Sequence, residues 1–290
     1  MKKLFYILLF VPFTLFGQHT FSIVAIDSVT HEIGSAGATC GDSQTWPGTP
    51  GAALISNISP GQGAIHTQSY WNSINQSNAN QLLFEGLQAD EIINWLIDND
   101  AENNPSIRQY GAVTLINNNI VSDSYTGNNC FDYKNHIIGD NYAIQGNILL
   151  GQSVLDSMET RFLNTTGTLS QRLMASLQGA KVIGADTRCY EDQVSSLSAF
   201  LRVAKENDNI DDLYIDIVVE STPNFIDPID IVQQEFTLLI NSLNIPEIKN
   251  AQSKLIKMID IFGREHSIHN HGTLLFYIYE DGKVLKKIIN

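Results

Sequence analysis

Apolar and polar positions divide the chain into alternating blocks of strands and helices. Strands are predicted at residues 21–27 and 32–39, joined by the turn-like SVTH stretch, and at 51–58 and 63–71, joined by SPGQG. The first is almost continuously apolar, which is typical of a strand covered on both faces. Apolar residues at helical spacing follow over 80–100, where Gly86 is expected to separate two short helices.

The same alternation continues to residue 243. Strands are predicted at 110–116 and 120–126 around a tight NNN turn, followed by an apolar stretch at 142–151, helices at 153–163 and 168–180, strands at 195–204 and 213–220, and a helix at 228–243. Thr168 and Gln171 have the spacing of a helix capping box. Such blocks differ from repeated βαβ units. They favour an α/β protein of the α+β kind, a four-layer αββα sandwich of two antiparallel sheets flanked by helices.

The two ends of the chain differ from this pattern. Residues 1–17 combine two lysines, an apolar run and the small residue Gly17, which is the layout of a signal peptide. The apolar run is shorter than the roughly 20 residues of a membrane-spanning helix. Residues 244–290 hold short strand-like runs and an Asp-Gly turn. The sequence therefore predicts a signal peptide at 1–17, a main domain at 18–243 and a small β tail at 244–290.

Composition and charge narrow the classes of partner. The chain is 43% hydrophobic and 17% charged, as globular proteins are, and its 17 Lys and Arg face 31 Asp and Glu, for a net charge of -14. Nucleic acid and anionic membranes are therefore excluded as partners. Phosphate-binding loops, dinucleotide fingerprints and a GxSxG motif are absent from the sequence, so we expect no cofactor.

Three cysteines, Cys40, Cys130 and Cys189, form no CxxC pair, which argues against a zinc site. One disulfide with one thiol left over is expected, and Cys130 with Cys189 is the favoured pair because both lie in polar, loop-like sequence. A histidine cluster in the tail, HSIHNH, could bind a metal, but the tail is expected to be removed. No metal site is predicted.

Several segments carry a resemblance to a known family. TFSIVAID, TQSYWN, LLFEGLQADE, YAIQGN and GADTRC resemble domain-of-unknown-function family 1028, over roughly Thr20 to Ser242. The family is described as having the Ntn-hydrolase-like αββα fold of proteasome β-subunits and related amidohydrolases. Because the family has no assigned activity, the resemblance implies a fold and leaves the function open.

The tail resembles the C-terminal sorting domain of proteins exported by the type IX secretion system, with a final hairpin of the main domain as the alternative. An exported protein, periplasmic, secreted or at the cell surface, is therefore expected. Its expected partners are a small-molecule or peptide ligand and, through the tail, the type IX machinery. A homo-oligomer is left open.

The resemblance to Ntn hydrolases implies that Thr20 is the nucleophile, because TFSIVA is similar to the opening strand of proteasome β-subunits. In that mechanism the free α-amine of the first residue accepts the proton of its own hydroxyl. Signal-peptide cleavage after Gly17 would leave Gln18 and His19 in front, so further trimming is required. The lysine and the aspartate of the proteasome pattern are missing: no lysine lies between Lys3 and Lys134, and Ala36 stands in the place of the acid.

Other polar residues are candidates for a substrate site. Gln68, Gln145 and Asn147 offer amide donors. Asp186 and Arg188 offer a carboxylate and a guanidinium, with a loop-stapling ion pair as the alternative role.

The leading hypothesis is an amidohydrolase or peptidase that acts on a small amide with Thr20 as the catalytic residue. The alternatives are a non-catalytic binding protein on the same fold and an exported structural module.

Overall fold

The computed structural model describes residues 20–243, 255–260, 263–266, 274–279 and 284–288. The predicted signal peptide, Gln18, His269, His271 and the Asp-Gly turn lie outside these residues. The chain divides into two compact units, residues 1–238 and 239–290. Among the described residues, no helix is both long enough and apolar enough to cross a bilayer.

The first unit contains a six-stranded antiparallel sheet in the order β10-β9-β2-β1-β8-β7. Its strands are β1 (Thr20–Ile26), β2 (Ile33–Thr39), β7 (Asn135–Gly139), β8 (Tyr142–Gly146), β9 (Ser198–Ala204) and β10 (Ile215–Val219). β1 lies between β2 and β8, with Thr20 opposite Thr39 and Phe21 opposite Gly146. Every residue of β1 is buried, which explains its nearly continuous apolar sequence.

The second sheet has four antiparallel strands in the order β3-β4-β5-β6. Its strands are β3 (Ser56–Ser59), β4 (Gly63–Gln68), β5 (Gln109–Ile116) and β6 (Asn119–Thr126). Asn117 and Asn118 both have positive φ, 52° and 61°, in the turn between β5 and β6. Asparagine tolerates this conformation better than most residues, so the NNN sequence closes the hairpin as predicted.

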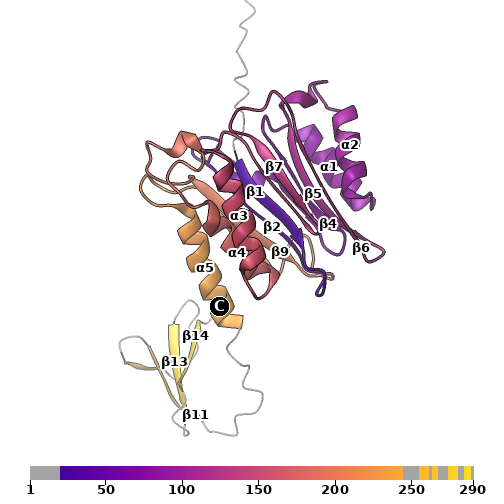
Figure 1. Cartoon of the computed structure of the whole chain (residues 1–290). Coiled ribbons are helices and arrows are strands. Elements are labelled where there is room, and N and C mark those ends of the chain that lie inside the picture. The colour runs from indigo at the N-terminus through magenta and orange to yellow at the C-terminus, as the bar shows by residue number, and fades with distance from the viewer. Residues whose placement is uncertain (1–19, 244–254, 261–262, 267–273, 280–283, 289–290) are drawn as a thin grey trace, which may run out of the picture. The chain divides into compact units, whose positions relative to one another are not determined.

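Helices cover the outer face of each sheet. α1 (Ser73–Phe84) and α2 (Ala89–Asp98) pack on the four-stranded sheet, and α3 (Gln152–Asn164) and α4 (Leu169–Ala180) pack on the six-stranded sheet (Figure 1). α5 (Pro228–Leu243) follows β10 in the chain. Thr168 and Gln171 form the predicted capping box of α4, and Gly86, with φ +81°, separates α1 from α2. The predicted αββα sandwich is confirmed.

The space between the two sheets is apolar at one end and polar at the other. Val24 and Ile26 of β1 pack against apolar residues of both sheets, among them Ile58, Ala64 and Val113. Because side chains alternate along a strand, Thr20 and Ser22 face the same way as Val24 and Ile26. The N-terminal end of β1 therefore carries its polar side chains into the region between the sheets.

Three local predictions differ from the structure, and one of them is the first helix, which begins at Ser73 rather than near residue 80. Residues 51–58 begin with a 3-10 helix, η1 (Gly51–Ile55), and only the end of the segment forms β3. The backbone at Gly51 has φ +57°, a conformation that glycine adopts without steric cost and that a regular strand does not contain. β7 was not predicted, because its sequence NHIIG has no clear period of two. Two further 3-10 turns, η2 (Pro105–Ile107) and η3 (Thr187–Cys189), lie in connections.

The described part of the second unit forms a four-stranded antiparallel sheet in the order β12-β11-β13-β14. Its strands are β11 (Leu255–Asp260), β12 (Glu265–His266), β13 (Leu274–Tyr279) and β14 (Val284–Ile288). Asp260 is buried and accepts hydrogen bonds from the backbone and the guanidinium of Arg264, at 3.0 and 2.7 Å. His266 Nε2 lies 3.2 Å from Asp260 Oδ2. A small β fold in the tail agrees with the strand-like runs of the sequence.

Candidate functional site

Thr20 begins β1 and is fully buried. Its carbonyl oxygen accepts a hydrogen bond from the backbone N–H of Asn147 at 3.1 Å and one from Gln68 Nε2 at 3.3 Å. Its hydroxyl has no hydrogen-bond partner among the described residues. Buried hydroxyls without a partner are uncommon in folded proteins, and among the described residues Ser122 and Ser176 also have one. The backbone of Thr20 is thus held firmly, while the hydroxyl is left unengaged.

A connected set of polar side chains surrounds the start of β1. Ser22 Oγ donates to Gln68 Oε1 and accepts from Gln145 Nε2, both at 2.7 Å. Gln68 Nε2 also donates to Gln109 Oε1 at 2.8 Å, and Asn147 Nδ2 donates to the same oxygen at 2.9 Å. Gln109 spans the gap between the sheets by donating to the carbonyl of Gly146 at 2.9 Å. These amides come from β4, β5, β8 and the residue after β8, so both sheets fix the position of Thr20.

His66 extends this set away from Thr20. Its Nε2 lies 2.6 Å from Ser35 Oγ, and its Nδ1 lies 3.2 Å from Gln145 Nε2. Burial lowers the pKa of His66 to about 3, and the positive charge of Arg202 adds to the shift. The imidazole is therefore neutral at physiological pH, with Nδ1 accepting from Gln145 and Nε2–H donating to Ser35. This arrangement agrees with a structural histidine rather than a general base.

Asp186 and Arg188 lie at the C-terminal end of β2, beside Thr39, which is the residue opposite Thr20 in the sheet. Asp186 is fully buried and accepts from the backbone N–H of Cys40 at 2.8 Å and from Arg188 Nη2 at 2.7 Å. Arg188 Nη2 also lies 3.3 Å from Thr39 Oγ1. Since Thr39 pairs with Thr20, the ion pair brings a guanidinium to the neighbourhood of the candidate nucleophile. The pair also staples its loop to β2.

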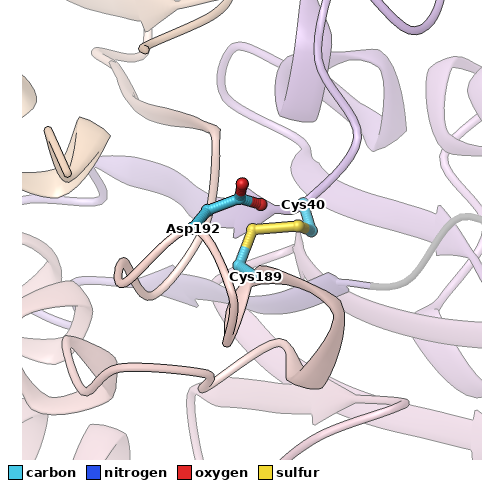
Figure 2. A group of neighbouring side chains, drawn as sticks. All are labelled: Cys40, Cys189 and Asp192. Carbon is cyan, nitrogen blue, oxygen red and sulfur yellow. A yellow bond between two sulfur atoms is a disulfide. The ribbon is translucent and has the colours of Figure 1, made fainter. Parts of the chain in front are cut away.

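The disulfide joins Cys40 to Cys189, with 5.7 Å between the Cα atoms (Figure 2). The predicted pair, Cys130 with Cys189, is wrong, and Cys130 is a free, buried cysteine. Loop-like sequence around a cysteine does not show which cysteine will lie near it. Here Cys40, directly after β2, lies next to the loop of Asp186, to which its backbone N–H donates. The thiol of Cys130 instead donates to the carbonyl oxygen of Arg108 at 3.2 Å.

Asp192 lies beside this disulfide, and one ligand atom from each of Cys40, Cys189 and Asp192 falls within 4.8 Å of the others (Figure 2). The two sulfurs are bonded to each other, so neither is a thiolate that could bind a metal. The group is therefore a disulfide with a neighbouring carboxylate.

A groove of about 510 Å³ lies past the C-terminal end of β2. Its residue Leu197 donates its backbone N–H to the carbonyl of Thr39 at 2.9 Å, which places the groove next to the candidate site. Asp42, also in the lining, accepts from Ser221 Oγ at 2.6 Å. Burial would raise the pKa of Asp42, but hydrogen bonds from Ser221 and Thr45 lower it below its ordinary value. The groove thus presents an ionised carboxylate. It is lined by Asp42, Gln44, Thr45, Leu197, Thr222, Pro223 and Asn224.

All of the site residues predicted from the sequence lie in this region. Gln68 and Asn147 donate hydrogen bonds to the Thr20 carbonyl. Gln145 donates to Ser22, two residues further along β1. Arg188 contacts Thr39, the strand partner of Thr20, and Asp186 accepts from the next residue, Cys40. Sequence reasoning missed Gln109, which connects Gln68 to Asn147. Its position at the head of an otherwise apolar strand was the available signal, since Thr20 and Gln109 share that placement.

Comparison with known proteins identifies the family. The model of the "Family of unknown function (DUF1028)" matches residues 20–229, so the chain belongs to that family. The crystal structure of protein SPO2555 from Silicibacter pomeroyi, described with the same family, has 23% sequence identity and a TM-score of 0.59. The match covers 76% of this chain and 88% of that one, and it supports the shared fold.

A second solved structure is Anbu (ancestral beta-subunit) from Yersinia bercovieri, with 11% identity and a TM-score of 0.35 over 80% of this chain and 100% of that one. At that score the likeness carries no conclusion for this chain. Comparison with curated proteins gives no match.

Proposed function

We propose that this protein is an amide hydrolase that becomes active when its chain is trimmed to begin at Thr20. The observation that carries the proposal is the buried Thr20 hydroxyl, which has no partner among the described residues although the carbonyl of the same residue is held by two donors. A hydroxyl that no other side chain engages remains available to the α-amine of its own residue and to a substrate. The αββα fold with Thr20 at the head of a central strand supports the same role.

The reaction would use Thr20 twice. Its free α-amine takes the proton of the hydroxyl while Oγ1 attacks the carbonyl carbon of an amide. The amine leaving group departs with that proton, and an acyl ester remains on Oγ1. Water then attacks the ester, releases the carboxylic acid and restores the hydroxyl. In a chain that extends past Thr20 the nitrogen is an amide, which is not basic, so the first step has no proton acceptor there.

The surrounding residues would position and polarise this group. Gln68 and Asn147 fix the backbone of Thr20, and Arg188 places positive charge beside Thr39. A nearby cation favours the deprotonated form of a group. The positive charge of Arg188 would supply part of the electrostatic effect of the lysine that proteasome-like sites have and this chain lacks. Asp186 partly neutralises the charge of Arg188.

The direct test compares chains with different first residues. A chain released from a cleavable fusion to begin at Thr20 should hydrolyse members of a panel of N-acetyl amino acid 4-nitroanilides. The chain that begins at Gln18 is the matched control and should be at least about 100-fold slower, since it lacks the general base. Thr20→Ser should retain part of the activity of the trimmed chain, and Thr20→Ala should have none.

Two results would contradict the proposal. One is equal turnover by the chains that begin at Thr20 and Gln18, and the other is turnover that survives Thr20→Ala. The first result would show that a free α-amine on Thr20 is not needed, and the second would place the hydrolysis outside this residue.

A binding protein on the same fold is the second candidate, and the groove beside β2 favours it. The side-chain amides of Gln68, Gln109 and Asn147 all donate to protein acceptors, so they serve the fold whether or not a reaction occurs. A melting-temperature screen with small peptides and sugars would separate the two candidates, because a ligand that binds the native state raises the midpoint. Stabilisation without turnover by the trimmed chain would favour binding.

We further propose that the protein is exported and that its tail engages the type IX secretion machinery. The Cys40–Cys189 disulfide supports an oxidising compartment, since such bonds are rare in the reducing cytosol. Intact mass and N-terminal sequencing of the protein secreted by its own host would test export, trimming and tail removal together. Recovery of the full 290-residue chain from inside the cell would contradict the proposal.

A further inference from the structure

Two aromatic side chains form a pair near the candidate nucleophile. The ring centroids of Tyr70 and Phe131 lie 5.6 Å apart, with the ring planes tilted by 36°. Tyr70 is partly buried and Phe131 is 48% exposed. Because the rings come from different segments, their contact depends on the tertiary structure. Neither residue belongs to a helix or a strand.

Two independent paths of contact connect this pair to Thr20. Tyr70 follows β4 two residues after Gln68, whose amide donates to the Thr20 carbonyl. The carbonyl of Phe131 accepts from the backbone N–H of Ile148 at 3.2 Å, and Ile148 is bonded in the chain to Asn147, the other donor to Thr20. The segments that carry the two rings are therefore attached to both donors of the Thr20 carbonyl, on the β4 and β8 side. Arg188 lies on the β2 side, next to Thr39.

The backbone that presents Tyr70 has an unfavourable conformation. Ser69 and Tyr70 have φ values of +54° and +34°, and a bulky side chain such as tyrosine rarely adopts positive φ. Such conformations persist only where surrounding contacts impose them, and they concentrate at functional sites. In this protein the carbonyl of Tyr70 accepts a hydrogen bond from Arg108 Nη1, which helps to hold this conformation.

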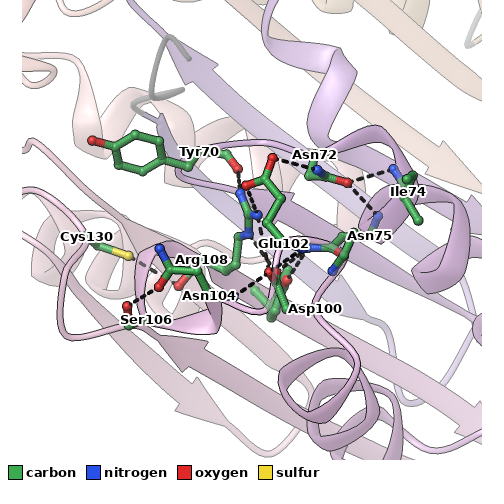
Figure 3. A network of polar contacts seen from close by, with 12 residues as sticks. Tyr70, Asn72, Ile74, Asn75, Asp100, Glu102, Asn104, Ser106, Arg108 and Cys130 are labelled. Carbon is green, nitrogen blue, oxygen red and sulfur yellow. Dashed lines mark hydrogen bonds and ion pairs between the residues drawn. The ribbon is translucent and has the colours of Figure 1, made fainter. Parts of the chain in front are cut away.

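Arg108 is held in turn by a buried network (Figure 3). Its side chain is 2% exposed, and its Nε donates to Asp100 Oδ2 at 2.7 Å while Nη2 donates to Glu102 Oε2 at 2.6 Å. Asp100 also accepts from Asn75 Nδ2 at 2.6 Å. Figure 3 shows the Tyr70 carbonyl turned toward the guanidinium and the Tyr70 ring pointing away from the network.

The same arginine fixes the segment of the second ring. The thiol of Cys130, the neighbour of Phe131, donates to the carbonyl oxygen of Arg108 at 3.2 Å. One buried residue thus holds both aromatic segments, through its guanidinium on one side and its carbonyl on the other. A network of this kind costs more to bury than apolar packing would, so its presence calls for a role in positioning.

From this placement we infer that Tyr70 and Phe131 form a substrate subsite that accepts an apolar aliphatic or aromatic side chain of the amide that Thr20 attacks. The inference rests on the proposed function. Rings bind such groups by burying apolar area and by offset contacts. An acidic group is disfavoured because the chain carries a net charge of -14 and because both nearby arginines are already engaged, Arg108 by Asp100 and Glu102 and Arg188 by Asp186.

The test measures binding apart from turnover. The chain that begins at residue 20 and carries Thr20→Ala is titrated by calorimetry with the 4-nitroanilides of N-acetyl-phenylalanine, N-acetyl-leucine and N-acetyl-glutamate. We expect the two apolar ligands to bind at least about 10-fold more tightly than the glutamate compound. Adding Tyr70→Asn or Phe131→Ala should reduce that preference by roughly 3- to 10-fold. Asparagine suits position 70 because it tolerates positive φ.

Phe84→Ala is the matched control, since Phe84 is an exposed aromatic residue, 74% accessible, at the far end of α1. It should leave the preference unchanged. Equal binding of the three compounds, no binding of any of them, or a preference that survives Tyr70→Asn and Phe131→Ala would overturn the subsite.

Turnover by the unsubstituted chain separates the two proposals. An apolar preference in binding without turnover would refute the hydrolase and retain the subsite. Turnover without an apolar preference would refute the subsite and retain the hydrolase.

Discussion

Gly111 determines whether the Gln145 amide can occupy its place between the sheets. A Cβ atom at position 111 would lie 1.9 Å from Gln145 Oε1 and 2.4 Å from Gln145 Cδ. The amide is fully buried and donates to Ser22, so it cannot move without breaking contacts. The absence of a side chain at Gly111 is therefore a requirement of the polar network.

Gly111→Ala should lower the free energy of unfolding by about 1–3 kcal/mol, the usual effect of overpacking a well-packed interior. Urea unfolding followed by circular dichroism would measure the loss. Gly151→Ala is the matched control, because a Cβ at position 151 meets nothing within 4 Å and its φ of 164° is ordinary extended backbone. An effect no larger at Gly111 than at Gly151 would show that Gln145 can give way.

His66 should make stability depend on pH. Burial lowers its pKa to about 3 in the folded chain, whereas the unfolded chain has the ordinary value near 6.5. Between these values the unfolded state binds more protons, so the stabilising contribution is complete above pH 6.5 and is lost as the pH falls toward 3. The free energy of unfolding should fall by up to about 1.4 kcal/mol per pH unit over that window.

Comparing the wild type with His66→Gln at pH 7, 6, 5 and 4 would isolate this contribution, because glutamine does not titrate. The stability difference between the two proteins should shift in favour of the variant as the pH falls. A constant difference would mean that the pKa of His66 is the same in the folded and the unfolded chain.

At the scale of elements, the disulfide connects β2 to the loop that carries Arg188. Cys40 and Cys189 are 149 residues apart in the sequence, so the bond closes a long loop of the unfolded chain. Replacing both by serine should lower the free energy of unfolding by about 3–5 kcal/mol. Thermal unfolding under non-reducing conditions would measure it. Cys130→Ser is the control and should keep the disulfide, since serine can still donate to the Arg108 carbonyl.

Counting thiols tests the pairing directly. The unreduced chain should expose one thiol in denaturant, and peptide mapping should assign it to Cys130. In the folded chain burial raises the pKa of the Cys130 thiol, so its reaction with alkylating reagents should be slow. A cross-linked peptide that contains Cys130 would contradict the structure.

At the scale of the whole molecule, the first unit has its own interior. The apolar clusters on either side of the four-stranded sheet are built from residues up to 213, and the family match ends at residue 229. A chain that ends at residue 243 should therefore fold, with a melting midpoint within about 2–4 °C of the full chain, the shift that 1 kcal/mol produces at this size. Calorimetry of both chains would test this. A truncated chain that fails to unfold cooperatively would show that the tail is needed for stability.

Most helices and strands could be predicted because apolar periodicity and capping residues are local features of the sequence. The period-two and apolar patterns gave β1, β2, β5 and β6, and the Thr168–Gln171 spacing gave the start of α4. The strand predicted at 51–58 begins instead with η1, because an apolar run alone does not distinguish a short helix from a strand. Gln109 was not predicted as a site residue, because its role depends on its contacts with Gln68 and Asn147, which are distant in sequence.

The sequence by itself determined the layered αββα fold, the family and the place of Thr20 at the head of a buried strand. These follow from the spacing of apolar and polar residues, which is a local property of the chain. The tertiary structure decided which groups meet there. The Cys40–Cys189 bond, the contact of Gln68 and Asn147 with the Thr20 backbone, and the hold of Arg108 on Tyr70 all join segments that are distant in sequence. Such contacts depend on how the two sheets pack, which no local pattern specifies.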